Sequence, residues 1–264
     1  MEKRKRVLIS TVVLKNVDSE VYGSHLSFAY RCGRECLDYD FYLAHPQRLA
    51  IDYGRNMAVC FAVANDFDYL FFYDDDTELP PNIMNKMLTT LEKFEKVDVL
   101  TASYYVRGSP FEVMAFVEDP GKKSWRFVKE GDFESLTDPE TGLVGPLKAV
   151  GNGCTLYRVS LLKGVDQHLN VELPQRVWFK TTYGVNTEDV WFFYKAHAQF
   201  ENVGIYLDPS IVCGHICARK EIVNKDNVVL LRKRAIEDQQ AQESLFIVGD
   251  HTPKEVGYAK KGDN

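Results

Sequence analysis

Three consecutive carboxylates, Asp74 to Asp76, follow the apolar run 69–73 and precede the pair Pro80–Pro81. The apolar run predicts a buried strand, and in an open α/β sheet the residues after the carboxyl end of a strand face the ligand crevice. Because alternate residues of an extended chain share a side, Asp74 and Asp76 are expected to project together. Two such carboxylates would form a hard-oxygen site for a divalent cation, with phosphate oxygens of a substrate completing it. The alternative is an acidic turn that caps the following helix.

The segment CGHIC places a histidine between two cysteines, at positions Cys213, His215 and Cys217. This spacing could suggest a metal cluster, but an isolated Cys-x-His-x-Cys lacks the second pair of ligands that a structural zinc site contains. The six cysteines of the chain fit reduced, mostly buried thiols better than a disulfide framework.

Strand-like and helix-like segments alternate over the first 106 residues. Apolar runs rich in β-branched and aromatic residues predict strands, and apolar residues three to four positions apart predict helices. The expected strands are 7–14, YDFYLA from Tyr39, 69–73 and 97–105, and the expected helices are 24–36, 55–66 and 82–94. This alternation is typical of a doubly wound, mostly parallel α/β sheet with helices on both faces.

The pattern changes after Arg107. Two β-like runs flank the turn-prone Pro120–Gly121, which predicts an antiparallel insertion over 107–147. A glycine-rich turn in AVGNGCTLYRVSLL then leads into a strand and a helix, and a later amphipathic helix begins with the acids of TEDVWFFYKAHAQ. We expect one domain over 1–222, followed over 223–264 by a charged helix and a tail whose composition is typical of disorder.

Composition limits the class of protein. With 264 residues and 45% hydrophobic content the chain can bury a large core, and a single elaborated domain is expected. The net charge of -6 argues against a surface built mainly to bind polyanions. No apolar run reaches the roughly 18 residues that a membrane helix requires, so we expect an intracellular, soluble, cytoplasmic protein whose oligomeric state is open.

Two known families place an Asp-x-Asp pair after an apolar strand. In haloacid-dehalogenase-type phosphohydrolases a Thr or Val stands two residues after the second Asp, whereas Glu78 takes that place here. The sequence instead resembles GT-A-fold glycosyltransferases, especially the large inverting family that uses nucleotide sugars. Four stretches in the same order carry this resemblance between about Val7 and Ile216, namely IDYGRNMAVCFAVANDFDYLFFYDDD, VGNGCTLYR, TEDVWFFYKA and DPSIVCGHI.

The resemblance implies a GT-A fold and a metal-dependent, inverting transfer from a UDP-sugar or GDP-sugar. Asp74 and Asp76 match the DxD motif of the family and His215 matches its late metal-ligand histidine, so these three would hold Mn²⁺ or Mg²⁺ against the diphosphate. Asp75 could replace one of the two acids if the strand register differs. Asp189 matches the Glu-Asp helix start and would be the general base, with helix capping as the alternative.

Other matched residues would line the nucleotide-sugar side of the site. Arg55 would make a charge-assisted contact and Asn56 a directional hydrogen bond to the nucleotide; the alternative is a water-exposed helix start. Gly151, Asn152 and Gly153 would let the backbone approach the donor sugar or the acceptor closely, or would form a plain turn.

The resemblance indicates the acceptor only by class. A saccharide or glycolipid headgroup is the default, and a hydroxymethylated DNA base is the alternative, because compact phage enzymes of this fold modify such bases. Val190 replaces the acidic or polar residue that usually follows the Glu-Asp pair, so the acceptor side is expected to be unusual. The competing function is a non-catalytic nucleotide-sugar-binding module, which would bind the donor without turnover.

Overall fold

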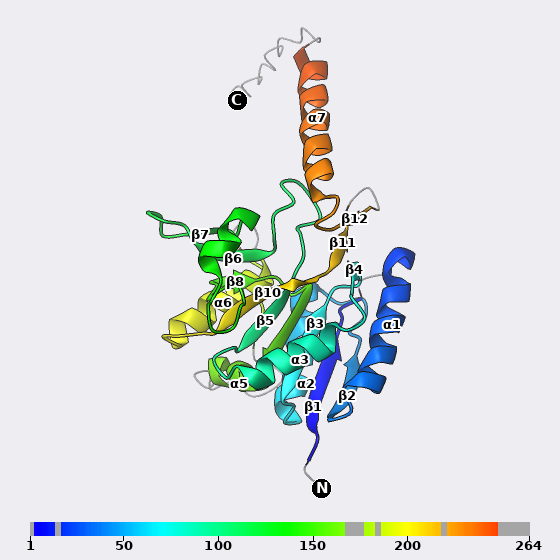
Figure 1. Ribbon diagram of the computed structural model, residues 1–264, viewed down its shortest axis with the longest axis vertical. Coiled ribbons are helices and arrows are strands. Elements are labelled where there is room, and N and C mark those ends of the chain that lie inside the picture. Colours follow the sequence, from blue (N-terminus) through cyan, green and yellow to red (C-terminus); the bar gives the residue numbers. More distant parts are fainter. Residues whose placement is uncertain (1–2, 14–16, 167–176, 183–185, 218–220, 248–264) are drawn as a thin grey trace, which may run out of the picture.

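The computed structural model describes residues 3–13, 17–166, 177–182, 186–217 and 221–247. Its centre is a six-stranded sheet in the order β10-β5-β9-β3-β1-β2 (Figure 1). Neighbouring strands are parallel except at β9, which runs antiparallel to both β3 and β5. The strands are β1 (Lys5–Ser10), β2 (Tyr39–Ala44), β3 (Tyr69–Tyr73), β5 (Val99–Ser103), β9 (Cys154–Arg158) and β10 (Ile205–Val212).

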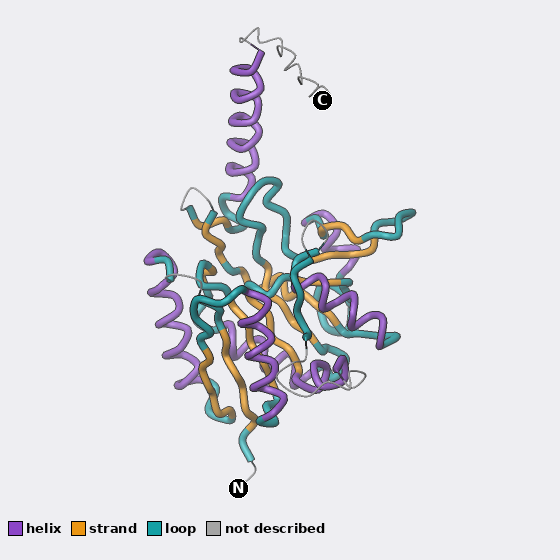
Figure 2. Tube along the Cα trace, turned by 180° about the vertical axis from the view of Figure 1, so that it is seen from behind, coloured by secondary structure: helices purple, strands orange, loops and turns teal. Residues whose placement is uncertain are grey.

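Helices cover both faces of this sheet (Figures 1 and 2). On one face α1 contacts α3, and on the other α2 contacts α5, which also contacts α6. The helices are α1 (Ser19–Glu35), α2 (Ile51–Ala64), α3 (Ile83–Lys93), α5 (Val159–Asp166) and α6 (Glu188–Gln199). Alternate residues of β1 point to opposite faces of the sheet. Val7 and Ile9 pack in the core under α1, and Leu8 packs in the core under α2. The sheet therefore separates two apolar cores.

Some predicted boundaries were wrong by several residues. The strand expected over 7–14 ends at Ser10, and beyond it only a hydrogen bond from Thr11 N to Ala44 O and an isolated bridge continue the pairing. The helix expected from residue 24 already begins at Ser19. The helix expected from residue 55 begins at Ile51, one turn earlier. The alternation of strands and helices was predicted correctly, and so were both ends of β2 and β3, while the ends of other elements differ.

The expected antiparallel insertion is present. It is a three-stranded sheet in the order β7-β6-β8, together with a 3₁₀ turn and the short helix α4. The elements are β6 (Ala115–Glu118), β7 (Trp125–Phe127), η1 (Glu130–Asp132), α4 (Phe133–Leu136) and β8 (Ala149–Val150). The turn between β6 and β7 contains Gly121 at a φ of 81°, a left-handed conformation that glycine adopts without strain. The third strand, β8, lies just beyond the predicted end of the insertion.

A second small sheet, β12-β11-β4, joins the turn after β3 to the last part of the domain. It consists of β4 (Thr77–Glu78), β11 (Gly214–Ile216) and β12 (Ile222–Val223). The last described helix, α7 (Val228–Ile247), extends away from the body of the molecule (Figures 1 and 2). The described helices include none with the length and apolar character needed to cross a membrane. The tail expected to be disordered lies mostly outside the described residues.

Candidate functional site

The candidate site lies at the carboxyl ends of β1 and β3, where the strand order reverses. From β1 the chain passes through α1 to β2 on one side, and then returns through α2 to β3 on the other side. Such a switch point leaves a crevice in which open α/β sheets bind ligands. The acidic turn begins there with Asp74, whose backbone N–H donates to Gly153 O at 3.2 Å. This bond ties the acidic turn to the glycine-rich loop before β9.

Asp76 and His215 form the first polar pair of the site. Asp76 precedes β4, and His215 stands opposite Thr77 in the antiparallel register between β11 and β4. His215 Nε2 lies 3.2 Å from Asp76 Oδ1, and its Nδ1 lies 2.8 Å from the carbonyl oxygen of Tyr105. Because a carbonyl oxygen can only accept, Nδ1 carries a proton and Nε2 faces the carboxylate.

The charges around this pair favour an imidazolium beside a carboxylate. Burial works to lower the pKa of His215, but the hydrogen bond and charge of Asp76 raise it above its ordinary value. Burial works to raise the pKa of Asp76, but His215 and Arg107 together lower it. Arg107 Nη1 lies 3.2 Å from Asp76 Oδ2, and the arginine side chain is 69% exposed. The positive charge that balances Asp76 therefore comes from a titratable ring and a solvent-exposed side chain.

Arg55 forms a second polar cluster with two acids from different elements. Its side chain is only 3% exposed, its Nη2 lies 2.7 Å from Asp74 Oδ1, and its Nη1 donates to Glu188 Oε1. Burial works to lower the pKa of Arg55, but the charges of Asp74, Glu188 and Asp189 raise it. Burial raises the pKa of Glu188 to about 7, against the lowering effect of Arg55. One permanently charged guanidinium thus lies among three carboxyl groups.

Asp189, the predicted general base, is buried in the first turn of α6. Its Oδ1 accepts hydrogen bonds from the Thr187 hydroxyl and, at 2.8 Å, from the backbone N–H of Val190. Its negative charge also acts on Arg55 and on the buried Tyr104 hydroxyl. Asp189 therefore belongs to the cluster around Arg55 while it also binds backbone at the helix start.

The loop Gly151–Gly153 packs against Tyr104. The backbone N–H of Gly153 donates to the Tyr104 hydroxyl at 2.9 Å, and a Cβ on Gly151 would lie 2.2 Å from that oxygen. The glycines are therefore needed here to admit a buried ring, whereas the sequence suggested close approach of a ligand. Asn152 is buried, and its Oδ1 accepts a hydrogen bond from Tyr157 at 2.6 Å. Its amide nitrogen has no hydrogen-bond partner among the described residues.

The side-chain amide of Asn56 forms hydrogen bonds within the protein. Its Oδ1 accepts hydrogen bonds from the backbone N–H groups of Trp178 and Phe179 at 2.7 and 3.0 Å, and its Nδ2 donates to Phe179 O at 2.7 Å. Both ends of the amide are therefore occupied by the segment before α6. The resemblance implied a contact of Asn56 with the nucleotide, whereas here the amide binds backbone groups of Trp178 and Phe179.

The carboxylates of the acidic turn have different partners. Asp76 lies beside His215 and Asp74 beside Arg55, while the charge of Asp75 acts on Tyr73. Across the described part of the chain, no three His, Cys, Asp or Glu side chains gather as a group that could hold a metal ion. The nearest arrangement is the two-residue set of Asp76 and His215. Cys213 and His215 of CGHIC have separate partners. The Cys213 thiol lies 3.2 Å from that of Cys154, and His215 lies beside Asp76.

Sequence reasoning missed several polar groups near this crevice. The hydroxyls of Ser10, Thr11 and Thr77 are buried without a hydrogen-bond partner among the described residues. His25 is also buried, and its Nε2 lies 2.7 Å from Thr77 O. The available signal was the polar pair Ser10–Thr11 inside the apolar run VLISTVVL, which was interpreted as one uninterrupted strand.

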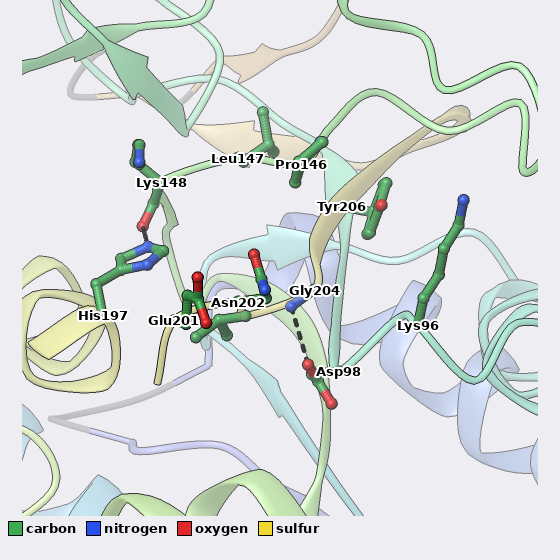
Figure 3. A pocket seen from close by; sticks show the side chains of 11 residues that line it. Lys96, Asp98, Pro146, Leu147, Lys148, His197, Glu201, Asn202, Gly204 and Tyr206 are labelled. Atoms are coloured by element: carbon green, nitrogen blue, oxygen red, sulfur yellow. Dashed lines mark hydrogen bonds between the residues drawn. The ribbon is translucent and has the colours of Figure 1, made fainter. Parts of the chain in front are cut away.

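A surface pocket of about 410 Å³ lies elsewhere, at the amino-terminal ends of β5 and β10 (Figure 3). Asp98 and Gly204, which line it, directly precede those two strands and are joined by a hydrogen bond of 2.9 Å. Lys148 and His197 lie on its other side. None of the residues implicated by the sequence lines this pocket, so it does not bear on their chemistry.

The fold class is the expected one, a mixed α/β domain whose mostly parallel sheet is flanked by helices and carries an added antiparallel sheet. The sequence matches no protein-family model. A search of curated proteins also finds no match.

Three solved structures are similar to this chain at low sequence identity. A197 from STIV is 17% identical, with 83% of this chain and 93% of that chain covered, at a TM-score of 0.47. S. aureus TarS 1-349 is 15% identical, with 78% and 60% covered, at a TM-score of 0.41, and it has also been solved in complex with UDP-GlcNAc. A glycosyltransferase involved in the glycosylation of the major capsid of PBCV-1 is 13% identical, with 77% and 81% covered, at a TM-score of 0.38.

Proposed function

We propose that this chain is a glycosyltransferase that moves a sugar from a nucleoside-diphosphate sugar to an acceptor hydroxyl, by default on a saccharide or glycolipid headgroup. One observation carries the proposal. Four separate segments bring Arg55, Asp74, Asp76, Glu188 and His215 to the carboxyl ends of the central strands. Charged groups this buried are costly to maintain, and clusters of them in a crevice are typical of functional sites.

Asp76 and His215 fit a divalent cation that has two protein ligands. The Tyr105 carbonyl fixes the ring of His215 through Nδ1, so once the ring loses its second proton the Nε2 lone pair points toward Asp76. A carboxylate oxygen and an imidazole nitrogen leave most positions of a six-coordinate ion open, and the diphosphate of the donor would fill part of them. Mn²⁺ or Mg²⁺ bound there would neutralise charge that develops on the departing diphosphate.

Asp189 is the proposed general base. In the transfer it would take the proton of the acceptor hydroxyl while the hydroxyl oxygen forms a bond to the anomeric carbon. The bond between that carbon and the diphosphate oxygen breaks, and its electron pair leaves with the nucleoside diphosphate. Because attack and departure occur on opposite sides of the carbon, the anomeric configuration inverts. The base would thus sit on the first turn of α6, next to the cluster of Arg55.

Arg55 would hold the proposed base and the proposed metal ligand at fixed positions relative to each other. It binds Asp74 of the acidic turn and Glu188, the residue directly before the proposed base. The helix start that carries Asp189 is thereby held at a fixed place relative to the turn that carries Asp76. A displacement of about 1 Å between reacting groups can slow a reaction about a hundredfold, so this bridge bears on turnover even without touching substrate.

The Asp189→Asn variant tests the proposed function. Asparagine keeps the size of the side chain and its ability to accept hydrogen bonds from Thr187 and Val190, but it cannot take a proton. Sugar transfer should fall by roughly 10² to 10⁴, with donor affinity and the free energy of unfolding nearly unchanged. Transfer is measured as metal-dependent release of nucleoside diphosphate in the presence of candidate acceptors.

Two results would contradict this function. If Asp189→Asn transfers sugar within a few-fold of the parent, the residue is only a helix-start acceptor and the base must lie elsewhere. If the parent binds a nucleotide sugar but releases no diphosphate with any metal or acceptor, the chain is a binding module. The Asp52→Asn variant is a matched control at the start of α2, where the carboxylate also accepts backbone hydrogen bonds but has no proposed chemistry.

A further inference from the structure

The exposed apolar side chains of the protein are concentrated at one edge of the main sheet. Of the fifteen large apolar side chains exposed in the described part of the chain, ten lie between Tyr22 and Phe61, on α1, β2, α2 and the loops that join them. We call this set the β2-edge surface. Scattered exposed apolar residues are normal, but a contiguous group on the surface marks a place where something binds.

On α1 the exposed residues form a stripe. Tyr22, Leu26 and Tyr30 follow one another at four-residue spacing and are 54 to 60% exposed. Ser24 accepts a hydrogen bond from the backbone N–H of Leu79, so that flank of the helix faces β4. The stripe begins on the opposite flank of α1, which faces outward past β2. Figure 1 shows α1 at this outer side of the sheet.

On the other face of the sheet α2 carries a matching stripe. Tyr53, Met57 and Phe61 are 47 to 59% exposed at the same spacing. Phe61 and Tyr42 of β2 both contact the ring of Phe67, with ring centroids 5.7 and 5.1 Å away. These contacts connect the stripe on α2 to the edge strand, so the β2-edge surface runs around the end of the sheet.

The strand at the centre of this surface has an open edge. β2 pairs with β1 on one side and ends the sheet on the other, and Leu43 at its end is 60% exposed. Proteins usually protect such edges with lysine, proline or a bulge. β2 has the sequence YDFYLA, and its one charged residue, Asp40, is paired with Arg4. The edge therefore carries neither lysine nor proline, and its single acid is paired.

The composition of the surface fits a protein partner. No lysine occurs between Lys15 and Lys86, while five of the fourteen tyrosines lie between residues 22 and 53. Protein interfaces are enriched in tyrosine, methionine and arginine and depleted in lysine. An anionic membrane would need the opposite, a surface rich in lysine and arginine without acids. Asp38, Asp40 and Asp52 lie here instead.

We infer that the β2-edge surface is the interface of a homodimer in which two copies pair through β2. Antiparallel pairing across a two-fold axis would join the two sheets into one and place α1 beside the partner's α1 and α2 beside the partner's α2. Ten large side chains at about half exposure offer at most on the order of 800 to 1,000 Å² per copy, and a stable interface buries about 800 Å² on each partner. The inference does not depend on the proposed function.

The mass of the full chain in solution tests this inference. Sedimentation equilibrium between about 1 and 100 µM should give twice the monomer mass of 30.2 kDa. Leu43→Glu on β2 and Leu26→Glu on α1 should each raise the dimer dissociation constant at least about tenfold, because each buries two symmetry-related charges. Both side chains are more than half exposed in the single chain, so both variants should fold.

A matched variant on α7 provides the control. Val229 is 69% exposed and lies outside the β2-edge surface, so Val229→Glu should leave the dimer intact. Hydrogen exchange of the β2 amides that point away from β1 should be slow in the parent and fast in Leu43→Glu. The inference fails if the parent is a monomer throughout the concentration range. A monomer that binds lipid vesicles would contradict it equally. The inference also fails if the dimer resists both Leu26→Glu and Leu43→Glu, or if Val229→Glu alone disrupts it.

Discussion

Asp74 and Asp76 are two residues apart in one turn, yet the protein balances their charges in opposite ways. Asp74 is paired with Arg55, a buried guanidinium that stays charged at every accessible pH. Asp76 is paired with the imidazole of His215 and with the exposed side chain of Arg107. The partner of Asp74 is buried and permanently charged, whereas the partners of Asp76 can be replaced by another cation. If the proposed metal binds, we expect Asp76 to be its ligand and Asp74 to remain with Arg55.

The largest expected effect comes from removing the permanent partner. In Arg55→Met, a side chain of similar length leaves Asp74 and Glu188 without their counter-charge in a buried place. Breaking a buried ion pair in this way costs about 3 to 5 kcal/mol in the free energy of unfolding, because the remaining charge is left uncompensated. Urea denaturation at neutral pH measures the loss.

Lys96 offers the control for this first prediction. It also lies between two acids, Asp138 and Glu140, at 2.9 and 2.6 Å, but on the surface. Lys96→Met should leave the free energy of unfolding close to that of the parent, because solvent screens these charges. An equal loss in both variants would show that burial does not distinguish the cluster of Arg55.

A smaller effect on the free energy of unfolding is expected from the titration of Glu188, the partner of Arg55. The pKa of Glu188 rises from 4.5 to about 7, chiefly through burial, so between these pH values the folded state holds a proton that the unfolded state has lost. The folded state binds more protons, and its stability therefore falls as the pH rises through this window. Glutamine does not titrate, so the stability of Glu188→Gln relative to the parent should improve across the window by up to about 3 kcal/mol.

Urea midpoints of the parent and Glu188→Gln at about pH 5, 6, 7 and 8 test this second prediction. The gap between the two proteins should change between pH 5 and 7 and then level off. A gap that stays constant with pH would mean that Arg55 keeps Glu188 fully ionised, and the cluster would then hold no proton near neutrality.

Periodicity was sufficient to predict the layers of the fold. The run 69–73 predicted a buried strand and helical spacing predicted α2, although the buried side of α2 carries Ala58, Val59 and Ala62 while Met57 and Phe61 are exposed. The ends of elements depend instead on individual hydrogen bonds, such as the one from Thr11 N to Ala44 O just after β1. Those contacts join residues far apart in the sequence, and periodicity carries no information about them.

The site shows the same limit at the level of single side chains. The rule that alternate residues share a side holds inside a strand, but β3 ends at Tyr73 and the three acids occupy the turn after it. Asp74 and Asp76 therefore contact different partners, although the strand rule placed them together. The partner of Asp74 comes from α2 and that of Asp76 from β11, and only the assembled fold determines both. Spacing found the residues and could not assign their contacts.

The smallest expected effect separates the two acids by metal dependence. If Asp76 is the exchangeable acid, Asp76→Asn should lower the metal-dependent part of UDP or GDP affinity by at least about tenfold, or roughly 1.4 kcal/mol. Asp74→Asn should keep the metal dependence, because its carboxylate is committed to Arg55. Calorimetric titrations of both variants and the parent, with Mn²⁺ and with chelator, measure the difference. If Asp74→Asn loses metal dependence as completely as Asp76→Asn does, Asp74 must leave Arg55 when the donor binds, and both acids of the DxD pair are ligands.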